Sequence, residues 1–366
     1  MSALPAAKTS PGNFFEDFQL GQTIRHATPR TVTLGDVALY NGLFGARFAV
    51  QSSDVFAQKI GYPRSPLDDF LVFHIVFGKT VADISLNAVA NLGYADCRFL
   101  KPVFPGATLT AVSDIIGLRE NSNKKTGIVY VRSRGFDETG DTVLDFARWV
   151  MVHKRDEAAA APVEKVPDLP KNVEPAQLGV ACPNISTAAY DTTLAGSPYR
   201  FGDYKTGDKI DHIDGITVEE AEHQIATRLY QNTARIHFNQ FAESKGRFGR
   251  RLIYGGHAIS LARALSFNGL ANAFHVAAIN GGRHVAPLFA GDTVFAWSEV
   301  LATAGMSSRK DVGALRLRTV ATKNRPCSDF PFKAGDEYDP AVILDLDYWV
   351  LMPGSARRLR QAPARR

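Results

Sequence analysis

One short run of the chain carries side chains suited to proton transfer and anion binding. The run from Tyr230 to Asn239 contains Asn232, Arg235 and His237. A neutral histidine, with a reference pKa of about 6.5, can take a proton from water. An asparagine amide can hydrogen-bond a polar group, and an arginine guanidinium can hold a carboxylate through two parallel bonds. Residues of these types could take part in acid–base chemistry and could bind an anion.

A glycine pair, Gly255 and Gly256, stands before the second of two strongly apolar helical stretches. Backbone N–H groups at a helix N-terminus favour negative charge, so this pair is a candidate oxyanion-binding element. The alternative is a Gly-Gly turn that allows close helix packing, and the two interpretations are compatible. In the first half, Asp68 and Asp69 precede the equivalent helix, and we expect them to act as N-terminal acids.

Several other kinds of site lack support in the sequence. His275 and His284 flank strand-like sequence without carboxylate or thiol partners at ligand spacing, so we predict no metal site. No nucleotide-binding, P-loop or serine-hydrolase motif occurs. The formal charge of +5 comes from five arginines at the C-terminal end, which leaves a neutral body and disfavours nucleic-acid binding.

The three cysteines, Cys97, Cys182 and Cys327, are odd in number and far apart. They form neither a disulfide framework nor a metal-binding pair, which favours a reducing cytoplasm. The N-terminal residues 1–12 lack an apolar core, so we expect no secretory leader and no membrane span.

The chain repeats itself. Residues 98–108 resemble residues 283–293 at an offset of 185, and residues 19–24 resemble 205–210 at an offset of 186. Residues 144–151 match 344–351 at an offset of 200, which places an insertion of about fifteen residues in the second copy, within 324–340. Two similar halves predict a duplicated fold packed about a pseudo-two-fold axis.

Each half has the same order of predicted elements, and the fold class is α+β. A helical stretch (36–60 or 218–245) precedes an apolar helix (67–86 or 256–273), and antiparallel strands follow, as at 108–118, 127–136 and 142–153 in the first half. One helix wrapped by a curved sheet, present twice, is a tandem hot-dog fold. We predict a first half at 13–155, a linker over the surface at 156–197, a second half at 198–354 and a basic tail at 355–366.

These motifs resemble the MaoC-like, double hot-dog hydratases and dehydratases that act on acyl-CoA thioesters. Residues 99–109 look like the strand-entry motif of that family, and residues 233–237 look like a degenerate form of its hydratase signature, approximately Asp-x-Asn-Pro-(Ile/Leu/Val)-His. Within the family, the run 230–239 most resembles the mesaconyl-CoA hydratases, also called β-methylmalyl-CoA dehydratases. The resemblance covers nearly the whole chain except the linker and the tail.

The resemblance implies roles for individual residues. The signature histidine falls on His237, but its aspartate falls on Asn232, and its proline falls on Arg235. The equivalent first-half segment, residues 46–51, has neither histidine nor acid, so we expect only the second half to be catalytic. The expected catalytic residues are His237, Asn232 and Gly256, and the expected substrate-binding residues are Arg235, Tyr230, Gly255, Arg283, Arg98 and Lys101, the last three for CoA phosphates.

The replacement of the aspartate has a physical explanation. A substrate carboxylate beside the reacting carbon would be repelled by an enzyme carboxylate, whereas Asn232 and Arg235 would attract it. In the alternative, Arg235 pairs with a surface acid and Asn232 caps a turn.

The preferred function is therefore reversible hydration of mesaconyl-CoA without a cofactor, by a cytoplasmic homodimer. The alternatives are an (R)-specific enoyl-CoA hydratase for uncharged chains and a non-catalytic acyl-CoA binding module.

Overall fold

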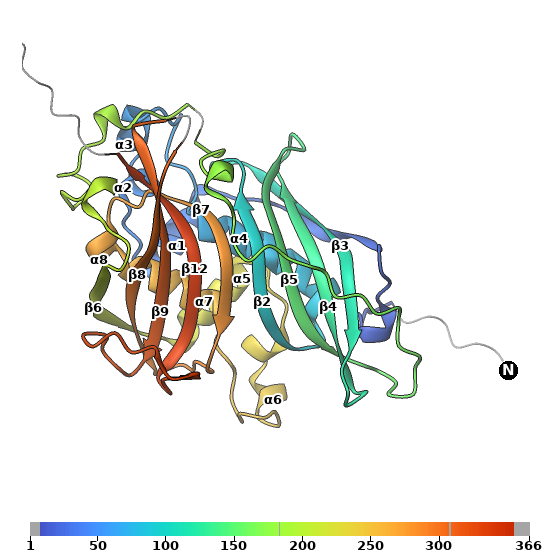
Figure 1. Cartoon of the computed structure of the whole chain (residues 1–366). Helices are drawn as coiled ribbons and strands as arrows, with labels where there is room; N and C mark the ends of the chain where they lie inside the picture. The colour runs from blue at the N-terminus through green and yellow to red at the C-terminus, as the bar shows by residue number, and fades with distance from the viewer. Residues whose placement is uncertain (1–7, 183, 307–308, 355–366) are drawn as a thin grey trace, which may run out of the picture.

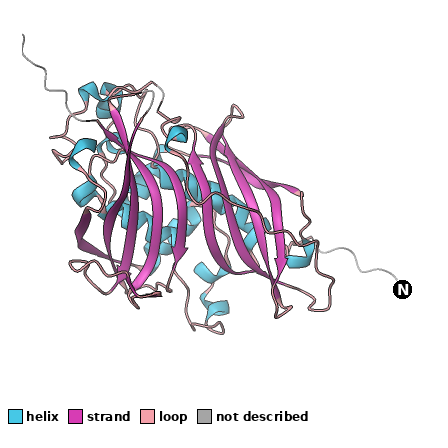
Figure 2. Cartoon of the chain, in the orientation of Figure 1, coloured by secondary structure: helices cyan, strands magenta, loops and turns pink. Residues whose placement is uncertain are grey.

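The structure is a computed structural model that describes residues 8–182, 184–306 and 309–354. Ten strands form one antiparallel sheet in the order β1-β3-β4-β5-β2-β7-β12-β9-β8-β6, and a two-stranded ribbon, β10 and β11, stands apart from it. The sheet lies on one side of the molecule and the main helices lie behind it (Figures 1 and 2). The predicted α+β, double hot-dog architecture is confirmed.

The strands are β1 Thr23–Thr31, β2 Ala88–Phe99, β3 Thr108–Glu120, β4 Thr126–Phe136, β5 Thr142–His153, β6 Lys209–Thr217, β7 His275–His284, β8 Thr293–Gly305, β9 Val312–Lys323, β10 Lys333–Ala334, β11 Glu337–Tyr338 and β12 Val342–Pro353. The α-helices are α1 Leu34–Phe44, α2 Ala49–Ser52, α3 Asp54–Lys59, α4 Asp69–Thr80, α5 Glu220–Leu229, α6 Gln240–Glu243, α7 Gly255–Leu265 and α8 Phe267–Leu270. The short helical turns are η1 Phe15–Asp17, η2 Val81–Ser85, η3 Pro175–Gln177, η4 Thr187–Ala189, η5 Phe201–Asp203 and η6 Arg235–His237.

The two halves meet where β2 pairs with β7. Tyr94 lies opposite Gly282, and Cys97 lies opposite Ile279. At the repeat offset of 185, Ile279 is the second-half counterpart of Tyr94 and Gly282 is that of Cys97, so each pair is the image of the other. This register is what a pseudo-two-fold axis between the halves requires.

Helix α4 is the central helix of the first half. Its residues from Phe70 to Thr80 are all buried, as expected for a helix that is apolar on nearly every face. Asp68 caps its N-terminus by accepting a hydrogen bond from the Phe70 N–H. At Gly78 a Cβ atom would lie 2.0 Å from the carbonyl oxygen of Tyr230, so only glycine lets α4 approach the second-half loop this closely.

The helical stretches that precede the central helices are shorter than predicted. The stretch 36–60 divides into α1, α2 and α3 because Gly45 ends α1 in the left-handed conformation. The stretch 218–245 divides into α5, η6 and α6, with Gln231 at a positive φ just after α5. The second break forms the loop that carries Asn232 and His237.

The insertion lies where the repeat placed it, because β10 and β11 fall between β9 and β12. The linker 156–197 crosses the outer face of the sheet (Figure 1), but it is not merely a surface connection. A buried cluster with Trp349 and residues of both halves includes the linker side chains Val173, Leu178, Ala181, Cys182, Ile185, Tyr190 and Ala195. The predicted basic tail at 355–366 lies outside the described residues.

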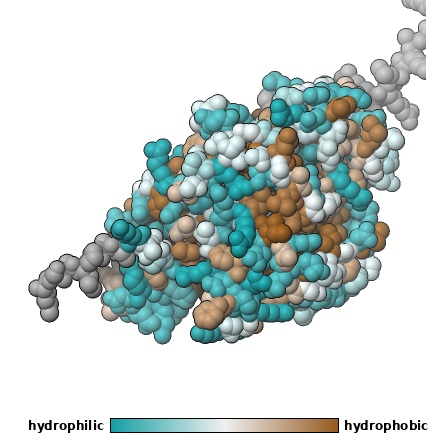
Figure 3. Space-filling model, turned by 180° about the vertical axis from the view of Figure 1, so that it is seen from behind, coloured by the Kyte–Doolittle hydropathy of each residue, from teal (hydrophilic) through white to brown (hydrophobic). Residues whose placement is uncertain are grey.

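The face opposite the sheet is largely hydrophilic, with apolar surface near its centre (Figure 3). Helices α1 and α5 pack against each other, and their exposed apolar side chains include Leu34, Leu39 and Ile225. Within the described residues, no helix is both long enough and apolar enough to cross a bilayer.

Candidate active site

His237 is held in one orientation by the backbone. It ends the short turn η6, and its Nδ1 lies 2.9 Å from the carbonyl oxygen of Leu252. Because a carbonyl oxygen only accepts, Nδ1 carries the proton and Nε2 presents a lone pair. Burial lowers the pKa of His237 to about 4, and the Leu252 carbonyl opposes this shift in part. The ring is therefore neutral near pH 7 and able to accept a proton.

The N-terminus of α7 lies beside this histidine. Tyr254 caps the helix, and its ring centroid is 5.5 Å from that of His237. His223 accepts a hydrogen bond of 2.8 Å from the Tyr254 N–H. Gly255 and Gly256 are the first two residues of α7, so their N–H groups have no intrahelical acceptor. The geometry thus fits both expected roles of the pair, since a Cβ on Gly256 would also overlap Tyr254 and His74.

A second histidine, His284 at the end of β7, completes this cluster. A Cβ atom on Gly255 would lie 2.4–2.6 Å from its imidazole ring. Its Nε2 is 3.2 Å from the hydroxyl of Tyr94 on β2. Burial, with a smaller contribution from His237, lowers the pKa of His284 to about 4. The motif analysis did not select His284, although it replaces the phenylalanine at the equivalent position of the first repeat, Phe99, and that difference was a visible signal.

A buried hydrogen-bonded chain connects Tyr254 to the first half. The Tyr254 hydroxyl is 3.4 Å from His74 Nδ1, and His74 Nε2 is 3.0 Å from Ser260 Oγ. The hydroxyl of Tyr40 lies 2.9 Å from Ser260 Oγ and 3.4 Å from Asp68 Oδ1. His74 is thus a core histidine whose two ring nitrogens both have hydrogen-bond partners.

Asn232 and Tyr230 lie in the loop that α4 contacts. Asn232 is buried, and its Oδ1 accepts a hydrogen bond of 3.0 Å from the Ala234 N–H. The side-chain carbonyl oxygen of Asn232 therefore caps a turn, as the alternative interpretation expected. Tyr230 is fully buried and its ring lies 4.7 Å from that of His74. Tyr230 thus lines the core beside the site.

The expected cations divide into two groups. Arg98 lies 3.3 Å from Asp96 and 3.6 Å from Asp145, and Lys101 binds two aspartates of the β4–β5 loop at 2.5 and 2.7 Å. These carboxylates neutralise both side chains, so the prediction that Arg98 and Lys101 hold CoA phosphates is not supported. The partners of Lys101 are 36–40 residues away and Asp145 is 47 residues from Arg98, which sequence spacing did not reveal, whereas Asp96 is only two residues from Arg98.

Arg235 and Arg283 are exposed and have no carboxylate partner among the described residues. Arg235 reaches across to the first half, where its Nη2 is 3.4 Å from Asn87 Oδ1. Because Arg235 is exposed, a substrate carboxylate that paired with it would stay in contact with water. The expectation that it pairs with a surface acid fails, because its partner is an amide.

Two buried cations of the first half were missed by the sequence analysis. Lys79 on α4 is 2% exposed, and its Nζ contacts the Thr28 carbonyl and Gln231 Oε1. Burial lowers the pKa of Lys79 to about 8. Arg148 on β5 is fully buried; it donates 2.9 Å to Thr80 Oγ1 and lies 4.3 Å from the centroid of Phe77. Within the described part of the chain, neither cation has a carboxylate within 4 Å.

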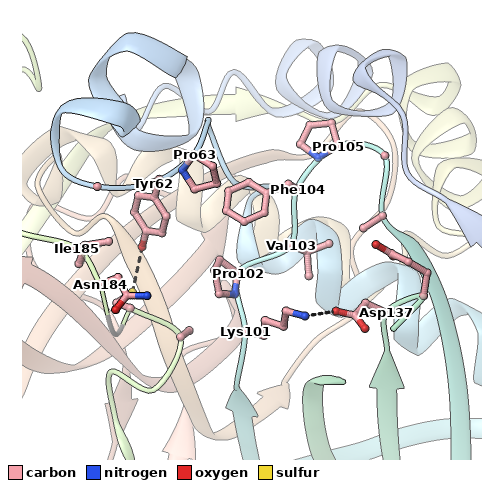
Figure 4. Close-up of a pocket in the computed structure, with 16 residues that line it drawn as sticks. Tyr62, Pro63, Lys101, Pro102, Val103, Phe104, Pro105, Asp137, Asn184 and Ile185 are labelled. Atoms are coloured by element: carbon pink, nitrogen blue, oxygen red, sulfur yellow. Dashed lines mark hydrogen bonds and ion pairs between the residues drawn. The ribbon is translucent and has the colours of Figure 1, made fainter. Parts of the chain in front are cut away.

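A surface cleft of about 520 Å³ lies elsewhere, on the first half (Figure 4). Tyr62, Pro102 and Phe104 line it, together with linker residues that include Ile185. Its cation is Lys101, which Asp137 neutralises, and the Tyr62 hydroxyl is engaged by Cys182 at 3.0 Å. The described residues that line the cleft include no histidine, and of their two acids Asp137 pairs with Lys101 while Glu138 accepts a hydrogen bond from the Thr108 N–H, so we do not assign the chemistry to it.

Two wrapped helices, a buried histidine in the loop before the second helix and a glycine pair at its start define a MaoC-like double hot-dog hydratase or dehydratase. The model of the mesaconyl-CoA hydratase family matches residues 2–334. The chain therefore belongs to that family, which confirms the predicted family and the predicted enzyme class, a hydro-lyase.

Two curated relatives cover almost the whole chain. A β-methylmalyl-CoA dehydratase from Chloroflexus aurantiacus is 63% identical over 95% of this chain and 99% of its own length. A mesaconyl-CoA hydratase from Cereibacter sphaeroides is 58% identical over 94% of this chain and 99% of its own length.

Solved structures agree with the fold. The crystal structure of a MaoC domain protein dehydratase from Chloroflexus aurantiacus has a TM-score of 0.93 at 62% identity, covering 96% of this chain and all of that one. A conserved hypothetical protein from Mycobacterium tuberculosis, described as having a double hotdog fold, has a TM-score of 0.71 at 25% identity, covering 93% of this chain and 98% of that one.

Proposed function

We propose that this protein catalyses the reversible hydration of mesaconyl-CoA to β-methylmalyl-CoA. The observation that carries the proposal is the neutral His237, whose Nδ1 is bound to the Leu252 carbonyl and whose Nε2 has no partner among the described residues. It lies beside the two N–H groups that begin α7, which have no intrahelical acceptor. Family membership and the two curated relatives support the same chemistry on the same pair of thioesters.

The proposed reaction uses these groups in defined roles. His237 Nε2 accepts a proton from water while the water oxygen bonds to Cβ of the enoyl thioester. The N–H groups of Gly255 and Gly256 stabilise the negative charge that develops on the thioester oxygen. Protonation at Cα then completes the addition. In the reverse direction the same groups assist loss of water.

The charge of the surroundings supports a dicarboxylic acyl group rather than an uncharged one. Lys79 contacts the loop residue beside Asn232, and Arg148 lies against Phe77, whose ring is 5.9 Å from Tyr254. Burying a cation without a carboxylate is unfavourable by several kcal/mol. A substrate carboxylate would supply the missing negative charge. This role was assigned to Arg235 from the sequence, and the buried cations fit it better.

Spectrophotometry at the enoyl-thioester absorbance tests the proposal. We expect wild-type enzyme to hydrate mesaconyl-CoA with kcat/KM at least tenfold above that for crotonyl-CoA. His237→Gln should lose at least a hundredfold in kcat on mesaconyl-CoA, since general-base catalysis contributes about 10²–10⁴-fold, while the circular dichroism spectrum stays unchanged. A wild-type preference for crotonyl-CoA, or an active His237→Gln variant, would overturn the proposal.

We infer that exposed cations bind the CoA phosphates. Arg283 and Arg250 lack carboxylate partners among the described residues, unlike Arg98 and Lys101. Arg250 lies 3.9 Å over the ring of Phe289, which holds its guanidinium at the surface. Replacing either by alanine should raise KM with little change in kcat, and the increase should diminish at high salt. Lys101→Ala is the matched control and should leave KM unchanged.

The remaining expectations are also proposals. The reaction needs no cofactor beyond the CoA of its substrate, so dialysis against a chelator should leave activity unchanged. The protein acts in the cytoplasm, which accords with its three buried, unpaired cysteines. Whole chains associate as homodimers, and light scattering at micromolar concentration should give twice the chain mass of 39.9 kDa. A monomer mass would reject the dimer.

A further inference from the structure

The loss of the signature aspartate leaves one proton without an evident carrier. Hydration removes a proton from the water that attacks Cβ and adds a proton at Cα, the other carbon of the double bond. His237 can accept the first. Asn232 cannot donate as an acid, and its carbonyl oxygen is engaged by Ala234. A second group is therefore required at the site, or His237 must perform both transfers.

Tyr94 and His284 form a hydrogen-bonded pair at this place. They come from different halves, and the Tyr94 hydroxyl is 3.2 Å from His284 Nε2. Burial raises the pKa of Tyr94, so its hydroxyl keeps its proton and can donate it to Nε2. The proton of the neutral His284 ring then resides on Nδ1. The pair thus presents an N–H group backed by a second donor.

Two glycines clear the space that these rings occupy. A Cβ on Gly255 would lie 2.4–2.6 Å from the His284 ring, and a Cβ on Gly282 would lie 3.1 Å from the Tyr94 ring. His284 therefore lies directly on the first residue of α7, the same residue whose N–H serves the oxyanion. Both glycines belong to the half that carries His237.

The duplicated chain supplies an internal comparison. At the repeat offsets, His284 corresponds to Phe99 and Gly282 to Cys97, while Gly255 corresponds to Asp69. The counterpart of Tyr94 is Ile279. None of the four features occurs at the equivalent place of the other half, which also lacks a counterpart of His237. The Tyr94–His284 pair and its two glycines therefore occur only at the site that contains the proposed base, His237.

We propose that His284, backed by Tyr94, is the catalytic acid that delivers the proton to Cα, in place of the signature aspartate. The inference rests on the proposed hydration of an enoyl-CoA. His284 touches the substrate, and Tyr94 acts through it as a positioning residue. The N-terminal half, which was expected to be non-catalytic, thus contributes to the reaction.

The proton balance is complete. Water loses a proton to His237 Nε2, and its oxygen forms the bond to Cβ while the double-bond electrons move to Cα and the thioester oxygen. Cα takes the Nδ1 proton of His284, whose Nε2 receives the Tyr94 proton. The Tyr94 oxygen becomes anionic opposite Arg148, its direct neighbour on β5, which lies on the same sheet face. Transfer from protonated His237 through solvent restores Tyr94.

The first test separates proton delivery from binding. His284→Gln should lower kcat for mesaconyl-CoA about 10²–10³-fold with KM changed less than threefold, and the solvent deuterium isotope effect on kcat should increase. His275→Gln, at the other end of the same strand, is the control and should behave as wild type. A His284→Gln variant with kcat within threefold of wild type, or one whose only defect is a raised KM, would overturn the inference.

Conservative variants keep the test valid if His284→Gln is unstable. Tyr94→Phe removes one oxygen and should lower kcat about 10–100-fold, whereas Tyr338→Phe, at a hydroxyl bound to Asp345, should not change it. Gly255→Ala should reproduce the loss by displacing the His284 ring. Full activity in both Tyr94→Phe and Gly255→Ala would reject the pair.

The two proposals fail separately. If wild-type enzyme hydrates mesaconyl-CoA and His237→Gln does not, the proposed function stands even when the His284 variants are fully active. If wild-type enzyme hydrates no enoyl-CoA, the proposed function fails before the pair is tested.

Discussion

Acid should unfold this protein unusually steeply, because five histidines are buried in the neutral form. They are His74, His212, His223, His237 and His257, and each is at most 9% exposed. Burial lowers the pKa of each, to about 3, 4, 2, 4 and 3 in that order, from an unfolded value near 6.5. The more exposed His284, whose pKa is also lowered to about 4, adds to their effect. The unfolded chain therefore binds more protons than the folded chain between pH 6.5 and about 4.

The sign and size of the effect follow from this difference. Well above pH 6.5 all five rings are neutral in both the folded and the unfolded state, so they do not change the free energy of unfolding. As the pH falls below 6.5, protons bind the unfolded chain only, and stability is lost until the folded rings titrate near pH 4 and below. At pH 5.5 each histidine costs about 1.4 kcal/mol, so five cost about 7 kcal/mol, comparable to the whole stability of a typical domain, about 5–15 kcal/mol.

Urea unfolding followed by tryptophan fluorescence between pH 8 and 5 measures the slope directly. Between pH 6 and 5 we expect the free energy of unfolding to fall with a slope close to that of five protons bound by the unfolded chain only. Activity should disappear with the fold. His257→Phe should reduce the slope by one proton. A free energy of unfolding that changes by less than about 2 kcal/mol between pH 7 and 5.5 would refute the burial argument.

Three further substitutions and one control test the contact between the halves. Gly78→Ala should lower the free energy of unfolding by about 1–3 kcal/mol and lower kcat/KM, because its Cβ would overlap the Tyr230 carbonyl. The control Gly42→Ala, on an exposed helix face where the Cβ would have nothing within 4 Å, should instead raise the free energy of unfolding by about 1 kcal/mol in the same urea titration. Lys79→Met should raise the free energy of unfolding by about 1–4 kcal/mol while lowering kcat/KM for mesaconyl-CoA more than for crotonyl-CoA, and equal losses would count against a carboxylate partner. Arg235→Met should change kcat/KM less than about fivefold for both substrates, because exposed pairs contribute about 1 kcal/mol or less; a larger, selective loss would restore the role first assigned to it.

The fold was predictable because its signals are periodic and repeated. Helix α4 is apolar on every face, and the strand-entry motif recurs at a constant offset, so both the buried helices and the duplication are visible in one sequence. The insertion between β9 and β12 was located by the change of offset from 185 to 200. These features depend on local pattern, which sequence records directly.

The partners of charged and catalytic side chains were less predictable. Lys101 is neutralised by two aspartates of the β4–β5 loop and Arg98 by Asp145 of β5, and these contacts depend on strand pairing rather than on spacing. Only Asp96, on the same strand as Arg98, is a partner close in sequence. Tyr94 and His284 are 190 residues apart and meet only because β2 pairs with β7. The sequence around Arg148 is typical of a strand. Only the structure shows that this arginine is buried with no carboxylate within 4 Å among the described residues.

The contact between His74 and Ser260 shows what joining two copies in one chain permits. Each is the sixth residue of its helix, α4 and α7, and the residues that cap these helices, Asp68 and Tyr254, end the same hydrogen-bonded chain. The pseudo-two-fold axis therefore passes between a ring and a hydroxyl. In an assembly of identical halves, a histidine here would have to face a histidine, or a serine a serine. Gene fusion frees the two positions to differ, so one can fill the volume that the other leaves. Having diverged at its axis, neither half is any longer a suitable partner for a copy of itself.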